Sequence, residues 1–138
     1  MDATVKWNTK MNFTAKADSG YEVVMDAYSN VGGEDLGPRP TELVLMGLGG
    51  CTGMDVVSIL EKMKQEITSF EIKLHADKAQ EHPKIFTHIV MEYIVTGRNI
   101  DRGAVEKAVM LSREKYCSVQ AMLRKAAEIE IKVTVLEV

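Results

Sequence analysis

The sequence predicts an α+β domain in which a largely antiparallel sheet packs on one long central helix. Two observations predict this class. Apolar and polar residues alternate near both ends of the chain, as they do in half-exposed strands, and one long apolar run occupies the middle. The expected order is β-β-β-α-β-β-α-α-β, and we expect residues 1–138 to form a single domain. The segments are strands in 2–26, a loop in 27–39, the central helix 40–64, strands in 67–97, helices in 101–127 and a final strand 128–137.

The central helix carries signals at both of its ends. Pro40 suits a first helical position, and Glu42 in the first turn and Lys62 in the last turn match the helix dipole. Apolar residues occupy almost every direction around the helix axis, so we expect it to be buried on every side. It is long enough to be mistaken for a membrane span, but it contains Asp55, Ser58 and four glycines, so we predict no membrane span.

The remaining segments follow from turn and cap signals. Turn-like residues divide 2–26 into three short strands, and the glycine- and proline-rich loop 27–39 is of a length that is usually functional or mobile. Asp101 is a predicted N-cap, and the segment 115–118 is a predicted break after which Ser118 caps a short helix.

Composition excludes several classes of function. The net charge is −3 and the basic residues are scattered, which argues against a nucleic-acid surface. The chain shows no signal peptide, so we expect a cytoplasmic protein whose two cysteines form no structural disulfide. A catalytic or redox pair then becomes worth considering. The three histidines show no ligand spacing with either cysteine, so we expect no metal and no cofactor.

Cys51, near the middle of the central helix, has two interpretations. Free cysteine is often a small buried apolar residue. Against that, Cys51, Asp55, Ser58 and Lys62 form a polar line at helical spacing, which requires a partner or a cavity. Chemistry would require the thiolate, yet Asp55 one turn away opposes it, so a cation must come from elsewhere.

Arg39 and Glu42 are the candidate polar partners of Cys51. They precede Cys51 by twelve and nine residues, roughly 18 Å and 13 Å along a straight helix at about 1.5 Å per residue. Arg39 of the same chain therefore reaches Cys51 only if the loop folds back or the helix breaks. A site shared across an antiparallel dimer that crosses at the glycines is the other route, and the one we expect. Arg39 could also be a solvated loop charge.

Cys117 lies at a predicted helix start, where free N–H groups and the helix dipole favour a thiolate. It is a candidate resolving cysteine. The alternative is again a small buried residue.

Two motifs resemble the OsmC/Ohr family. Pro-x-Glu-Leu-Val-Leu-x-x-Leu-Gly-Gly-Cys-Thr spans residues 40–52, and Lys-Tyr-Cys-Ser-Val spans residues 115–119. The resemblance extends over essentially the whole chain and is strongest to the YhfA-like branch, through 49–52, 55–60 and 86–89. The family places its glutamate directly after the proline, where this chain has Thr41 and then Glu42.

The resemblance implies an intertwined homodimer with sheets wrapped around central helices and active sites at the interface. It implies a thiol peroxidase of the oxidative stress response that reduces organic hydroperoxides. Cys51 would become a sulfenic acid, Cys117 would resolve it to a disulfide, and an external dithiol would reduce that disulfide. Arg39 and Glu42 are the nearest matches to the arginine and glutamate that polarise the family's site.

Two other functions remain open at this point. One is a non-catalytic dimeric module of the same fold that binds a small molecule or senses redox state beside a stable thiol. The other is a dimer with inert cysteines, which would form no disulfide after peroxide treatment.

Overall fold

The computed structural model describes residues 1–138, which fall into two compact units. The N-terminal unit is Met1–Val44 and the C-terminal unit is Leu45–Val138, and each is described by itself. The prediction that the chain forms a single domain stays a prediction.

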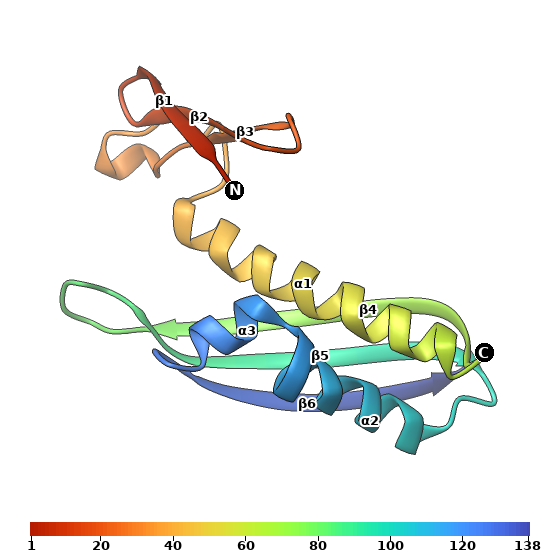
Figure 1. Cartoon of the computed structure of the whole chain (residues 1–138). Helices are drawn as coiled ribbons and strands as arrows, with labels where there is room; N and C mark the ends of the chain where they lie inside the picture. Colours follow the sequence, from red (N-terminus) through yellow and green to blue (C-terminus); the bar gives the residue numbers. More distant parts are fainter. The chain divides into compact units, whose positions relative to one another are not determined.

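The N-terminal unit contains a three-stranded antiparallel sheet in the order β1-β2-β3 (Figure 1). Its strands pair with their neighbours in sequence, as predicted from the turn residues between them. A short 3-10 turn follows, and the first residues of the long helix α1 complete the unit. The elements are β1 (Ala3–Thr9), β2 (Asn12–Ala17), β3 (Glu22–Met25) and η1 (Ser29–Val31), with α1 beginning at Pro40.

The N-terminal unit has no apolar core of its own. Its one buried residue is Asp26, which is 3% exposed. The Asp26 carboxylate accepts hydrogen bonds from the backbone N–H groups of Ala27, Glu34 and Leu36 at 2.8 to 3.3 Å. Large apolar side chains of the sheet are in contrast exposed, among them Trp7 at 61%. Backbone hydrogen bonds to one carboxylate therefore hold the loop after β3 against its strand.

The C-terminal unit contains a second sheet, in the order β4-β5-β6, with helices over one of its faces (Figure 1). Strands β4 and β5 are antiparallel, whereas β5 and β6 are parallel. Helix α1 spans Pro40–Lys62, and its residues from Leu45 onward belong to this unit. The other elements are β4 (Glu66–Lys78), β5 (Phe86–Arg98), α2 (Arg102–Leu111), the π-helical turn η2 (Ser112–Tyr116), α3 (Ser118–Leu123) and β6 (Glu128–Glu137).

The parallel pair explains why α2, η2 and α3 lie between β5 and β6. Parallel neighbours cannot be joined by a tight hairpin, so the chain must cross over before it pairs again. Asp101 caps α2 as predicted, because its Oδ1 accepts the Gly103 N–H at 2.9 Å. The predicted α+β class and order of elements are confirmed, and the sheets are largely antiparallel with this one parallel pair.

Helix α1 buries one stripe only, and not every side as predicted. Its buried residues recur at every fourth position: Leu48, Thr52, Val56 and Leu60. Leu48, Val56 and Leu60 join a core formed with the helix-facing side chains of β5, such as Met91, and with α2. Other apolar side chains of the helix are exposed: Val44 is 43% exposed, Met46 53% and Met54 77%.

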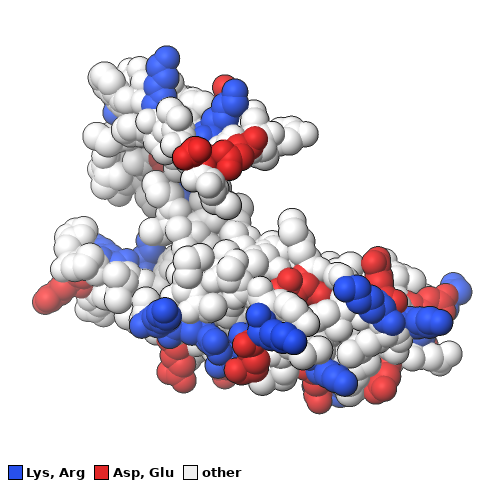
Figure 2. Space-filling view, viewed as in Figure 1, with Lys and Arg blue, Asp and Glu red and all other residues white.

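By length and composition alone, α1 is also the one helix that could cross a membrane. The stripe that it buries against strands and helices is, however, typical of a helix that packs on a folded core. The face drawn in Figure 2 shows acidic and basic side chains interspersed along the C-terminal unit, with no large area of one sign. This pattern agrees with the scattered charges of the sequence.

Candidate functional site

Cys51 and Cys117, 66 positions apart in the chain, are brought together in the C-terminal unit. Cys51 projects from α1, and Cys117 is the residue between η2 and α3. Both thiols are free, Cys51 half-buried and Cys117 buried. Each thiol shifts the pKa of the other, so the two side chains lie close together.

The π-helical turn η2 sets the position of Cys117. A π-turn accommodates one more residue than an α-turn and is frequent at functional sites. It ends where the Cys117 N–H donates to the Ser112 carbonyl at 2.8 Å. Cys117 then takes an extended conformation and caps α3, with its Sγ accepting the Gln120 N–H at 3.3 Å. The cap is thus Cys117 itself, and not Ser118 as predicted.

The first turn of α3 provides the hydrogen-bond donors around Cys51. The Val119 backbone N–H donates to the Cys51 sulfur, and the Ser118 hydroxyl lies 3.9 Å from it. Burial and the charge of Asp55 disfavour the thiolate, but the donors Val119, Cys117 and Ser118 outweigh them. The pKa of Cys51 is therefore lowered from its ordinary value.

Cys117 behaves in the opposite way. It is 2% exposed, and burial raises the pKa of its thiol, with its hydrogen bond to Cys51 acting in the same direction. The expectation that a helix start would favour a Cys117 thiolate is thus wrong: hydrogen bonds from Thr52 and Gln120 do lower its pKa, but burial dominates. The residues at this helix start lower the pKa of Cys51 instead.

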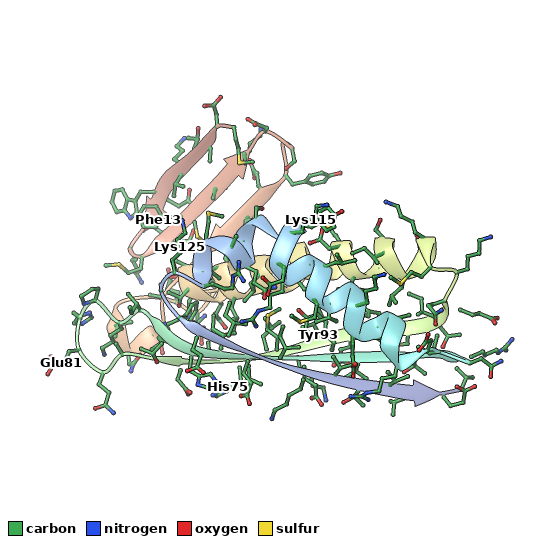
Figure 3. All side chains as sticks on the ribbon, turned by 60° about the horizontal axis from the view of Figure 1, so that its bottom comes forward. Phe13, His75, Glu81, Tyr93, Lys115 and Lys125 are labelled. Atoms are coloured by element: carbon green, nitrogen blue, oxygen red, sulfur yellow. The ribbon has the colours of Figure 1, made fainter.

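Buried polar side chains surround Cys117 on the side away from solvent. Thr52 Oγ1 donates to Cys117 Sγ at 3.3 Å, and Gln120 Nε2 donates to Thr52 Oγ1 at 3.3 Å. Thr52 and Gln120 are both fully buried. Tyr93 of β5 lies on the helix side of the sheet, opposite to the exposed His75 of β4 (Figure 3). Burial raises the pKa of Tyr93 to about 12, so its hydroxyl stays neutral near pH 7.

Asp55 links α1 to the turn that carries Cys117. Its Oδ2 accepts the Ser112 hydroxyl hydrogen at 2.9 Å, and the Ser112 carbonyl accepts the Cys117 N–H. Ser112 is fully buried. The polar line along the central helix, which the sequence showed, thus has a partner. Its partner residue Ser112 had no signal in the sequence beyond its place on the apolar face of a predicted helix.

Arg39 and Glu42 lie together in the N-terminal unit. Glu42 Oε1 accepts the Arg39 backbone N–H at 2.8 Å, and the guanidinium group also pairs with Asp35. The guanidinium carbon stacks 3.7 Å from the centre of the Tyr28 ring, and the Arg39 side chain is only 18% exposed. Arg39 is therefore held by four neighbours, the fourth being the Gly37 carbonyl, and is not a freely solvated loop charge. Helix α1 runs unbroken from Pro40 to Lys62.

The side chains of this chain do not form a set of metal ligands. No three or more His, Cys, Asp and Glu side chains gather closely enough to hold a metal ion. The donors around the cysteine pair are sulfur, hydroxyl, amide and backbone N–H groups.

The sequence and fold match known proteins. Residues 32–132 match the family model for OsmC-like proteins. The chain belongs to the OsmC-like family. It is 46% identical to protein YhfA from Escherichia coli strain K12, over 94% of this chain and 93% of that protein. The resemblance recognised in the two cysteine motifs is confirmed.

Solved structures share the same fold. A hypothetical protein from Aquifex aeolicus VF5 is 33% identical, with a TM-score of 0.87 over 99% of this chain and 96% of that one. An organic hydroperoxide resistance protein OsmC from Legionella pneumophila is 15% identical, with a TM-score of 0.73 over 97% of both chains. At that identity the second likeness shows the fold alone.

Proposed function

We propose that this protein is a cysteine-based thiol peroxidase that reduces organic hydroperoxides in the cytoplasm as part of an oxidative stress response. The observation that carries the proposal is the closeness of a thiol of lowered pKa, Cys51, to a second thiol, Cys117. Membership of the OsmC-like family supports it. So does the fold shared with organic hydroperoxide resistance proteins such as that of Legionella pneumophila.

The proposed reaction has two steps. The Cys51 thiolate attacks one peroxide oxygen, the O–O bond breaks, and the alkoxide leaves as an alcohol after taking up a proton. Cys51 is then a sulfenic acid. The Cys117 sulfur attacks the Cys51 sulfur, the S–S bond forms, and hydroxide leaves as water with the Cys117 proton. An external dithiol restores both thiols.

The donors around Cys51 fit the first step. A thiolate nucleophile requires a lowered pKa, and the Val119 N–H supports the charge without a nearby cation. Cys117, held neutral by burial, stays protonated until Cys51 has been oxidised. The unequal environments thus support attack by Cys51 and resolution by Cys117.

Arg39 and Glu42 are proposed to polarise the peroxide. Their own pairing, and the stacking of Arg39 on Tyr28, would hold a guanidinium group with a defined orientation. We further propose that the site is completed in a homodimer. The exposed apolar residues of the N-terminal sheet and of α1, such as Trp7 and Met54, support this, because monomers rarely leave so much apolar surface uncovered.

Stoichiometric treatment with an alkyl hydroperoxide, followed by mass spectrometry, tests the chemistry. We expect the parent to lose two hydrogens and to contain a Cys51–Cys117 disulfide. Cys51→Ser should abolish turnover, and Cys117→Ser should give a single oxidation that is not resolved. If both variants consume peroxide as fast as the parent, the proposal is wrong.

A second candidate is a dimeric module that binds a small molecule or senses redox state without turnover. An open groove of about 730 Å³ between α1 and β4 favours it, since Gly49, Gly50, Gly53 and apolar side chains line the groove. The pH dependence of Cys51 alkylation separates the two. A midpoint below that of an ordinary thiol supports the peroxidase, and an ordinary or raised midpoint supports the binding module.

A further inference from the structure

The environments of the two sulfur atoms differ in a way that bears on the reductive half of the cycle. Resting on the proposed function, we propose that the external dithiol attacks the sulfur of Cys51, and that Cys117 is the leaving group, received by the Thr52 hydroxyl and the Gln120 backbone N–H. Thr52 would then be a catalytic residue of disulfide reduction.

Access to the two sulfur atoms supports this direction. Thiol–disulfide exchange requires the incoming thiolate to reach the sulfur that it attacks. Cys117 is 2% exposed, whereas Cys51 is half-buried and lies beside the exposed residue Ser118. A second copy of the chain could only remove further surface, so dimer formation would not uncover Cys117.

The hydrogen bonds around Cys117 support it as well. Thr52 Oγ1 and the Gln120 N–H both lie 3.3 Å from Cys117 Sγ, and both donate to it. Gln120 Nε2 occupies the acceptor side of Thr52 Oγ1, which directs the hydroxyl hydrogen toward the sulfur. These donors are in place before any charge develops on Cys117, as stabilisation of a leaving group requires.

Leaving-group basicity alone would favour the reverse direction. Burial raises the pKa of Cys117, the pKa of Cys51 is lowered, and the less basic thiolate leaves faster. Access outweighs this preference, because a sulfur that the reductant cannot reach is not attacked at any basicity. The Thr52 and Gln120 donors offset part of the cost of forming a buried thiolate.

One thiolate of the dithiol bonds to Cys51 Sγ, the Cys51–Cys117 bond breaks, and its electron pair goes to Cys117, which then takes up a proton. The second thiol of the donor, as thiolate, attacks the donor sulfur in the mixed disulfide and expels the Cys51 thiolate. The donor leaves as an internal disulfide, having supplied two electrons.

The test uses the full chain, oxidised with diamide so that it does not depend on peroxidase activity. The oxidised protein is mixed briefly with 2-mercaptoethanol and quenched with N-ethylmaleimide, and tryptic peptides are analysed by mass spectrometry. We expect mercaptoethanol on Cys51 and maleimide on Cys117, which lies in the peptide 116–124. Mercaptoethanol on Cys117 would overturn the proposal, as would a failure of diamide to join the two cysteines.

Two variants of Thr52 separate its hydroxyl from its packing. Thr52→Val keeps the branched shape and loses the donor, and should slow dithiothreitol reduction of the disulfide by about tenfold. Thr52→Ser keeps the donor and loses a methyl group, and should reduce at nearly the parent rate. Equal rates for Thr52→Val and the parent, or equal slowing by Thr52→Val and Thr52→Ser, would contradict the donor role. A protein that passes both tests but does not consume hydroperoxide would refute the proposed function alone.

Discussion

The two units of this chain are stabilised by different means. Residues 45–138 surround a core of fully buried apolar side chains from α1, β5 and α2, such as Leu60 and Met91. Residues 1–44 bury one residue, the acidic Asp26. The difference indicates that the C-terminal unit has a hydrophobic core of its own, whereas the N-terminal sheet needs apolar cover from elsewhere.

The largest expected effect comes from cutting into the core. Leu60→Ala should lower the free energy of unfolding by about 2–5 kcal/mol, since Leu60 is fully buried. Val24→Ala in β3, where the side chain is 40% exposed, should cost about 0.5 kcal/mol or less if no partner covers it. Urea unfolding followed by circular dichroism measures both. A large cost at Val24 that grows with protein concentration would show that a second copy supplies the missing cover.

An intermediate effect is expected from filling the open glycine face of α1. A Cβ added at Gly50 meets no atom of the chain within 4 Å. Gly50→Leu should therefore leave the monomer folded, and even favour the helix by up to about 1 kcal/mol. It should shift sedimentation from dimer to monomer if helices cross there. Lys107→Leu, on the exposed face of α2, is the matched control, and an unchanged sedimentation coefficient for Gly50→Leu would place the interface elsewhere.

The smallest effect concerns the carboxylate that orders the N-terminal unit. Burial opposes its charge, but hydrogen bonds from Ala27, Leu36, Asn12 and Glu34 outweigh burial, so the pKa of Asp26 is lowered. Because the pKa of Asp26 is lower in the folded protein than in the unfolded one, its charge stabilises the fold above the unfolded pKa of about 3.9. This stability is lost as the pH falls through the folded pKa. Asp26→Asn should thus lower the thermal midpoint at pH 7 and have less effect near pH 3. An equal loss at both pH values would contradict this account.

Much of the fold could be predicted because it follows from local patterns. Alternation along 128–137 indicated a strand, and Asp101 showed its capping role directly. The parallel pairing of β5 with β6 could not be predicted, because alternation places residues on a face and does not orient one strand against another. The partial burial of α1 was missed for a related reason: an apolar composition does not say whether the chain or a second copy covers the helix.

The cysteine pair was predictable as a pair, but the source of activation was not. Among the charged residues of the sequence, Arg39 and Glu42 are the candidates for polarising Cys51. The structure adds a backbone N–H, from Val119, which is 68 residues further along the chain. Any residue except proline supplies such a group, so no side-chain type marks it in a sequence. Whether Arg39 and Glu42 also act on Cys51 stays a prediction.

The crossover between β5 and β6 gives the proposed disulfide a thermodynamic consequence. Cys117 lies on that crossover and Cys51 on α1, so a bond between them closes a loop of 66 positions. In the chain-entropy model, closing such a loop lowers the conformational entropy of the unfolded chain. This raises the free energy of unfolding by roughly 4 kcal/mol. Each turnover would then alternate the protein between a more and a less stable form. The resistance of the chain to unfolding would therefore fall as its reductant becomes more abundant.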